Sequence, residues 1–82
     1  MSSIPTIHLN GTSKDALLDG YIDAREAIRA AIDKLCETAP NGRDYYPQGD
    51  GAFEKARDEH IARLKRLHDV ATELGEIAER IA

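Results

Sequence analysis

The residues best suited to chemistry lie together at positions 40–51, which read Pro-Asn-Gly-Arg-Asp-Tyr-Tyr-Pro-Gln-Gly-Asp-Gly. The guanidinium of Arg43 offers a fork of donors that matches a phosphate group. The rings of Tyr45 and Tyr46 can stack on a base, and their hydroxyls can reach a sugar. The stretch therefore predicts an ordered loop that binds a small nucleotide.

Further polar side chains in the same stretch extend this prediction. Asn41, Asp44 and Gln48 carry amide or carboxylate groups that can recognise base and sugar edges. Gly42 lies among them and is counted as part of the same candidate site. The candidate ligand contacts in this loop are thus Asn41, Gly42, Arg43, Asp44, Tyr45, Tyr46 and Gln48.

The end of the stretch has its own features, and the whole loop has an alternative explanation. Gly49 and Gly51 allow close approach of a ligand to the first amides of the next helix, a natural anion site. In the alternative, both tyrosines cap the end of a helical core, and Arg43 pairs with the neighbouring carboxylate of Asp44. The residue types alone leave both possibilities open.

A second polar turn, His-Leu-Asn-Gly-Thr at positions 8–12, precedes the first expected helix. It adds His8, Asn10, Gly11 and Thr12 as candidate ligand contacts, although simple solvation explains His8 equally well. The helix between this turn and the loop has roughly 24 residues and would span about 36 Å. One subunit therefore cannot bring both patches to one ligand, whereas antiparallel association of two subunits can.

The sequence offers little for catalysis or metal binding. It contains no phosphate loop of Walker spacing, no nucleophile elbow and no HExxH pair. Cys36 is expected to be a small core residue, and His60 and His68 are expected to be packed, hydrogen-bonded side chains. No histidine pairs with a second Cys or His at zinc spacing. We expect no catalytic residue, no metal and no cofactor, and hence not an enzyme.

The first long helix is predicted from about Lys14 to about Glu37, within an element at 13–38. Thr12 or Ser13 is suited to the N-cap, and Pro40 ends the helix. The apolar stripe steps alternately by four and three residues, as in a helical hairpin or coiled coil. Its members are Leu17, Tyr21, Ala24, Ile28, Ala31 and Leu35, widened by Leu18, Ile22 and Ile32.

The second long helix is predicted from Gly51 or Ala52 to Ile81, within an element at 52–82, with Asp50 as its cap. Two pairs in the favourable order, Glu59 with Arg63 and Glu76 with Arg80, are expected to support it. The apolar positions are Phe53, Ala56, His60, Ile61, Leu64, Leu67, Ala71, Leu74, Ala78 and Ile81.

These elements predict an all-α fold: an antiparallel two-helix hairpin with an N-terminal arm at 1–12 and a functional loop at 39–51. Residues Ile4–Asn10 alternate in polarity as in a short strand, with Ile7 and Leu9 on one side. An extended arm lying on the helices is the equal alternative. A chain of 82 residues with a single cysteine is marginal as a lone monomer, so association into a helical bundle is expected.

The charge and hydropathy of the chain limit its partners. A formal net charge of −4 argues against broad binding to DNA or RNA, which needs many basic residues on one face. No apolar run serves as a signal peptide or approaches the roughly 20 residues of a membrane span. A lone thiol is typical of a reducing compartment. These features predict a cytoplasmic protein without a membrane or bulk nucleic-acid partner.

Two of the motifs carry a resemblance to known proteins. His-Leu-Asn-Gly-Thr at 8–12 and Pro-Asn-Gly-Arg-Asp-Tyr-Tyr-Pro-Gln-Gly at 40–49, with the two helices, resemble a family of small phage and prophage proteins over nearly the whole chain. In size and helical-hairpin design the chain also resembles the phage sponge proteins of anti-CBASS and anti-Thoeris type. That second likeness is one of architecture, so no sponge residue is carried over to a position here.

The resemblance to sponges implies a function. Sponges are oligomers that sequester cyclic nucleotide or cyclic ADP-ribose signals without degrading them, and so silence bacterial immunity. We therefore expect a phage-encoded homo-oligomer, a dimer or larger, in the host cytoplasm that binds such a signal. The alternative is a structural or adaptor protein in which the loop and the arm are protein–protein contacts.

Overall fold

Two long helices account for most of the chain in the computed structural model, which describes residues 3–82. Helix α1 spans Lys14–Cys36 and helix α3 spans Ala52–Ile81. Between them lie the short helix α2, Gly42–Tyr45, and the 3₁₀ helix η1, Tyr46–Gln48. Residues 3–82 contain helices and no strand, which confirms the all-α prediction.

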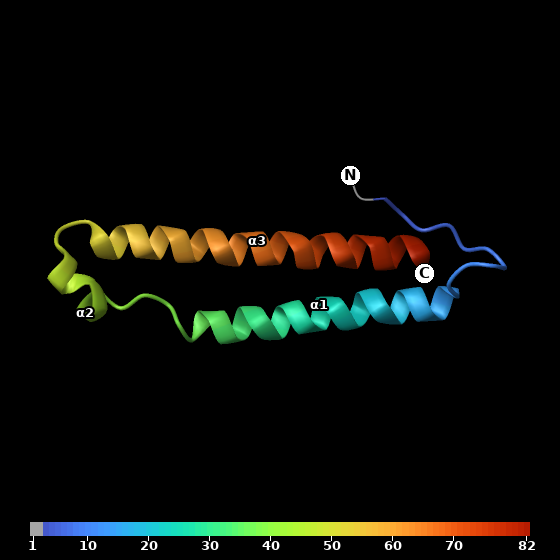
Figure 1. Ribbon diagram of the computed structural model, residues 1–82, viewed down its shortest axis with the longest axis horizontal. Coiled ribbons are helices and arrows are strands. Elements are labelled where there is room, and N and C mark those ends of the chain that lie inside the picture. Colours follow the sequence, from blue (N-terminus) through green and yellow to red (C-terminus); the bar gives the residue numbers. More distant parts are fainter. Residues whose placement is uncertain (1–2) are drawn as a thin grey trace.

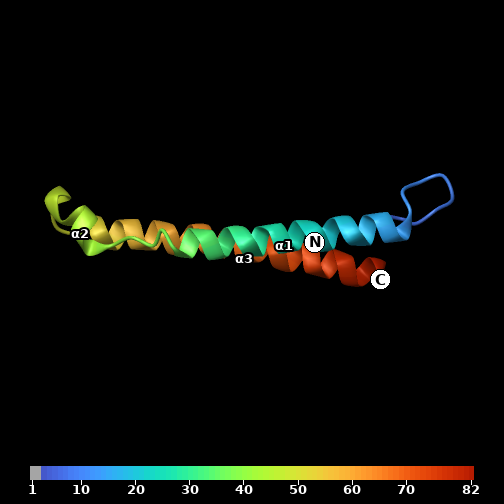
Figure 2. The same ribbon diagram turned by 90° about the horizontal axis from the view of Figure 1, so that it is seen from below.

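The two long helices lie side by side and run in opposite directions (Figure 1). Helix α2 lies at one end of the pair and the N-terminal arm at the other, and Figure 2 shows the same thin shape from below. The molecule measures 61 × 22 × 17 Å, with a radius of gyration of 18.2 Å. A compact chain of this length would have a radius of about 12 Å. Within residues 3–82, the only interior is therefore the seam between α1 and α3.

The ends of α1 are set by local hydrogen bonds. The Ser13 hydroxyl accepts a hydrogen bond from the Ala16 amide at 3.2 Å, which makes Ser13 the N-cap. At the other end, the Thr38 hydroxyl donates to the Leu35 carbonyl at 2.7 Å. The predicted bounds of this helix were therefore correct to within one residue at its C-terminus.

The seam on α1 differs from the predicted stripe at two positions. Ala24 and Ala31 are exposed, whereas Arg25 is half-buried and Ile32 is only 6% exposed. Ile32 removes far more apolar surface from water than an alanine would, so the helix turns this residue inward. The other apolar members of the stripe are half-buried except Ile22, which is 44% exposed.

The apolar positions predicted on α3 are confirmed with one exception. Ile61 is 55% exposed, so its assignment to the apolar face was wrong. The others are buried or half-buried: Phe53, Ala56, His60, Leu64, Leu67, Ala71, Leu74, Ala78 and Ile81. The step of four and three residues therefore identified the face of α3 that packs against α1.

Helix α3 begins differently from the prediction. Its N-cap is Gly51, in a left-handed conformation with φ of 84°, and no side chain accepts a hydrogen bond there. Asp50 was therefore wrongly predicted as the cap. Gly49 also has positive φ, 100°, and the Ala52 amide donates to its carbonyl at 3.4 Å. The positive φ angles of Gly49 and Gly51 therefore turn the chain into α3, and no side-chain hydrogen bond caps this helix.

The surface ion pairs also differ from those predicted. Neither Glu59 with Arg63 nor Glu76 with Arg80 forms an ion pair within residues 3–82. On α3 Lys65 instead pairs with Asp69 at 2.8 Å, with both side chains well exposed. Such pairs contribute little to stability. Within residues 3–82, every helix is too short or too polar to cross a membrane.

The N-terminal arm is extended and forms no strand over residues 3–12; residues 1 and 2 of the predicted arm lie outside the described part. It turns back along the C-terminal end of α3 (Figure 1), where Ile4 and Pro5 are half-buried. Ile7 is 43% and Leu9 98% exposed, so the apolar side of the arm is not covered. A lone strand has no edge to pair with, so of the two predicted alternatives the extended arm is the one observed over residues 3–12.

The glycines of the long helices offer a matched test of the seam. Gly20 has nothing within 4 Å of an added Cβ, whereas a Cβ on Gly75 would lie 3.2 Å from Nε of Arg25. Gly20→Ala is expected to raise the free energy of unfolding by about 1 kcal/mol, and Gly75→Ala by clearly less, because Arg25 must move. Urea unfolding followed by circular dichroism measures both. An equal increase in the free energy of unfolding for the two variants would contradict the close contact between Arg25 and Gly75.

Candidate functional site

The loop between the long helices is ordered by a cap of its own. Oδ1 of Asn41 accepts hydrogen bonds from the Arg43 amide at 2.9 Å and from Arg43 Nε at 3.4 Å, and so begins α2. The amide oxygen of Asn41 is therefore already engaged. No ion pair joins Arg43 to Asp44 in the described chain, so this part of the alternative prediction was wrong.

The two tyrosines of the loop point in different directions. Tyr45 is half-buried, whereas Tyr46 is 84% exposed. Tyr46 lies with Gly42 and Arg43 around an open hollow of about 500 Å³. Tyr45 instead lines a separate groove against the long helices. Consecutive residues on a helical turn are rotated by about 100°, which accounts for the divergence.

We call this second hollow the loop groove. It has a volume of about 350 Å³, within the range of small-molecule sites. Three segments form it: the end of α1 with the residues that follow, helix α2, and the first third of α3. The lining residues are Leu35, Thr38, Pro40, Tyr45, Ala56, Glu59, His60 and Arg63.

His60 is the most deeply placed polar group of the loop groove. It is only 7% exposed, and its Nε2 has no hydrogen-bond partner among the described residues. Packing of His60 was predicted correctly, but the prediction of a hydrogen bond was wrong for this atom. A buried polar atom without a partner costs about 1–3 kcal/mol. A side chain that carries such an atom in the wall of a groove is a candidate contact for a ligand.

The other polar groups of the loop groove are Thr38, Glu59 and Arg63. Glu59 and Arg63 do not pair with each other, so both charges remain available to the groove. The Thr38 hydroxyl donates its hydrogen bond to the Leu35 carbonyl, so toward the groove its oxygen can act only as an acceptor. The groove thus combines a guanidinium, an imidazole, a carboxylate and a phenol ring.

Sequence reasoning predicted a site at the same end of the molecule as the loop groove but named only one residue that lines it. Among the predicted loop contacts, Tyr45 alone lines the loop groove, while Asp44 and Gln48 are exposed elsewhere on the loop. Thr38, Glu59, His60 and Arg63 were not predicted as contacts. One sequence feature could have indicated these contacts. His60 occupies a seam position of the second long helix, and Arg63 follows it by about one turn on the same face.

The second candidate patch lies at the opposite end of the molecule (Figure 1). The Gly11 amide donates to the His8 carbonyl at 3.1 Å, which closes a turn. The His8 ring covers Gly11 so closely that an added Cβ would lie 2.6 Å from Nε2. Asn10 and Thr12 are exposed beside this turn. Within one subunit these residues are therefore far from the loop, as predicted.

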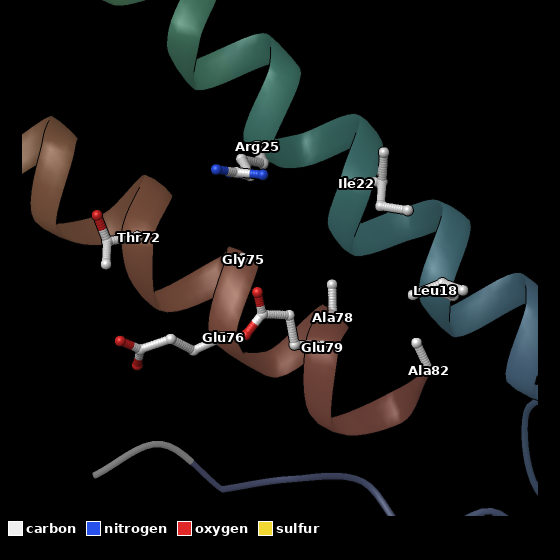
Figure 3. Close-up of a pocket in the computed structure, with 9 residues that line it drawn as sticks. All are labelled: Leu18, Ile22, Arg25, Thr72, Gly75, Glu76, Ala78, Glu79 and Ala82. Atoms are coloured by element: carbon white, nitrogen blue, oxygen red, sulfur yellow. The ribbon is translucent and has the colours of Figure 1, made fainter.

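A larger groove lies along the other half of the helix pair. Figure 3 shows Arg25 reaching from α1 toward α3 near Gly75, with Leu18 and Ile22 beside it on α1. The groove has a volume of about 440 Å³, and Nε of Arg25 is buried without a hydrogen-bond partner among residues 3–82. Two carboxylates of α3, those of Glu76 and Glu79, also line it. These acidic groups make it less suited than the loop groove to an anionic ligand.

Of the remaining candidates for chemistry, His68 lines a hollow in the described chain, one of about 360 Å³ shared with Arg25, Arg29 and Asp33. Cys36 is exposed, so its prediction as a core residue was wrong; Leu35, its neighbour, is the residue that is half-buried. His68 is exposed as well and was not packed as predicted. Across residues 3–82, no three His, Cys, Asp or Glu side chains lie close enough together to hold a metal ion.

Comparison with known proteins adds no relative to this picture. No protein-family model, no curated protein and no solved structure matches the chain. The resemblance of the two motifs to phage proteins therefore stays a prediction, and the geometry of the chain itself must support any functional proposal.

The unpartnered nitrogen of His60 leads to a stability prediction. His60→Leu keeps the packing of the seam and removes the buried polar atom, so the free energy of unfolding is expected to rise by about 1 kcal/mol. His60→Ala, which leaves a cavity, is expected to lower it by about 1 kcal/mol or more. Thermal unfolding of the three proteins gives the comparison. A loss of stability in His60→Leu would show that the imidazole is satisfied in the folded protein.

Proposed function

We propose that this chain binds a small nucleotide-derived signalling molecule and holds it without cleaving it. The observation that carries the proposal is the loop groove, where the Tyr45 ring and an apolar wall lie beside the unpaired Arg63 and the buried His60. An aromatic face with nearby cationic donors is the combination that stacks a base and binds a phosphate.

The biological setting of the proposal rests on the resemblance described above. We propose that the protein is phage-encoded and acts in the cytoplasm of the host cell. There it would sequester a cyclic nucleotide or cyclic ADP-ribose-type immune signal, as sponge proteins do. The net charge of −4 supports this setting, because it disfavours competition by bulk nucleic acid.

We further propose that the working unit is a homo-oligomer of helical hairpins, a dimer or larger, joined in a helical bundle. The chain exposes 6258 Å², whereas a compact protein of 9.0 kDa would expose about 4,900 Å². The excess is larger than the roughly 800 Å² that each partner buries in a standard interface. Ala24, Ala31 and Ile61 belong to the apolar surface left for a second copy.

Antiparallel association would also join the two candidate patches. The His8–Thr12 turn and the loop lie at opposite ends of a molecule 61 Å long. In an antiparallel pair the turn of one subunit meets the loop of its partner. Asn10 and Thr12 would then contact the ligand together with Arg43 and Tyr46, so the complete site would be shared between subunits.

A structural or adaptor role is the alternative, and one observation favours it. The largest exposed apolar side chains at the two ends are Leu9 and Tyr46, at 98% and 84% exposure. Aromatic side chains are enriched in the cores of protein–protein interfaces, so a partner chain covering either end of the rod would bury these residues. In that role the chain would have no affinity for nucleotides.

A native mass spectrum tests the proposal against this alternative. The purified protein is measured alone and with cyclic dinucleotides, cyclic trinucleotides and cyclic ADP-ribose isomers. The expected result is a defined oligomer that gains a whole number of ligands of unaltered mass. A ligand returned with altered mass would reveal an enzyme, and an oligomer indifferent to the whole panel would favour the adaptor role.

Arg43→Ala separates the two roles by a second route. The main cap contact uses the Arg43 backbone amide, so α2 should survive the change. For a ligand site, affinity is expected to fall about tenfold or more with the helical content and subunit count unchanged. Arg66→Ala, exposed on α3, is the matched control. If the unmodified protein binds no nucleotide and Arg43→Ala disrupts the oligomer, Arg43 is instead an assembly contact.

A further inference from the structure

We propose that the loop groove is a phosphate-ester site in which His60 and Arg63 hold the phosphate of a single nucleotide unit. The identity of the ligand as a nucleotide rests on the proposed function. The placement of its phosphate rests on the groove alone. The sequence prediction had assigned the phosphate to Arg43, which lines a different hollow.

The position of His60 is the first argument. Its side chain is more than nine-tenths buried, yet Nε2 has no protein partner and the residue lines the groove. The neighbouring seam positions of α3 are filled by apolar side chains, so packing alone does not require an imidazole here. An acceptor oxygen of a ligand within the groove would satisfy this nitrogen and remove the cost of leaving it unpaired.

Arg63 supplies the charge that distinguishes a phosphate from a neutral acceptor. It follows His60 by three residues, so both side chains project from the same face of α3. Its guanidinium forms no ion pair among the described residues and lines the same groove. A guanidinium beside an imidazole donor is a frequent arrangement for binding phosphate oxygens.

The other lining residues of the groove determine how the rest of the ligand would lie. Leu35, Pro40 and Ala56 are apolar, and with the Tyr45 ring they are suited to a flat base. Glu59 is an acceptor for sugar hydroxyls. The chemistry of these side chains therefore assigns the base to the Tyr45 ring and the phosphate to His60 and Arg63. A volume of about 350 Å³ admits one nucleotide unit.

The test follows the His60 ring directly in the intact protein. Two-dimensional NMR of the imidazole nitrogens is recorded at constant pH in a phosphate-free buffer. The spectrum is repeated with inorganic phosphate, with AMP and with each ligand that the native mass spectra identify. His68 lines a separate hollow with Arg25 and Arg29, so its ring reports phosphate binding outside the loop groove and serves as the internal comparison. Affinities of Arg63→Ala and of the control Arg66→Ala are measured by calorimetry.

Two outcomes support the inference. In the first, a nucleotide shifts the His60 ring signals but not those of His68, and Arg63→Ala weakens binding about tenfold or more while Arg66→Ala does not. In the second, no nucleotide binds, but inorganic phosphate shifts His60 selectively. That result would keep the phosphate site and overturn the proposed nucleotide function.

Two other outcomes overturn it. If a nucleotide binds while the His60 signals and the affinity of Arg63→Ala stay unchanged, the ligand lies on the open face of Arg43 and Tyr46. The proposed function then survives without the loop groove. If neither a nucleotide nor inorganic phosphate affects His60, the groove is not a phosphate site and His60 is only a packed side chain.

Discussion

The structure depends on a single seam between two helices. A side chain in such a seam is covered by one partner helix and remains open on its flanks. Only five apolar residues of the described chain are buried, and no large side chain is completely enclosed. The burial of apolar surface that stabilises a compact domain is therefore limited here. This limit explains both the rod-like shape and the apolar surface that a second copy would cover.

A thin seam also changes what a polar side chain within it can do. In a thick core, an unpaired imidazole or guanidinium would be sealed from any ligand. Here Arg25 and His60 lie at the seam with an unpartnered nitrogen each, and both line grooves. Arg25 lies against Gly75 on α3, whose missing side chain leaves space for it. His60 lines the loop groove beside Arg63, so its ring is the one that a ligand in this groove would reach.

The sequence predicted the elements well because their signals are local. Alternating steps of four and three identified both long helices, and Ser13 was a cap by residue type. Ile32 was predicted on the apolar stripe, but the rotation of α1 that exposes Ala24 and Ala31 and half-buries Arg25 was missed, because both sets of residues fit the same periodicity. Which of these residues face the seam is decided by packing against α3, which the sequence pattern of α1 alone does not contain. The loop groove was missed for a related reason, since it forms where α2 folds Tyr45 back over α1 and α3.

The helical turn at Gly42–Tyr45 gives the loop two distinct faces. A simple extended connection would have left the side-chain directions of Arg43, Tyr45 and Tyr46 undetermined. With Asn41 capping this turn, Tyr45 faces the groove while Arg43 and Tyr46 face solvent. The inner face is suited to one nucleotide unit of a ligand, and the outer face is free for another subunit. In an antiparallel pair the outer face would meet the exposed Leu9 turn of the partner, so Arg43 and Tyr46 would serve both the subunit contact and the remainder of the ligand.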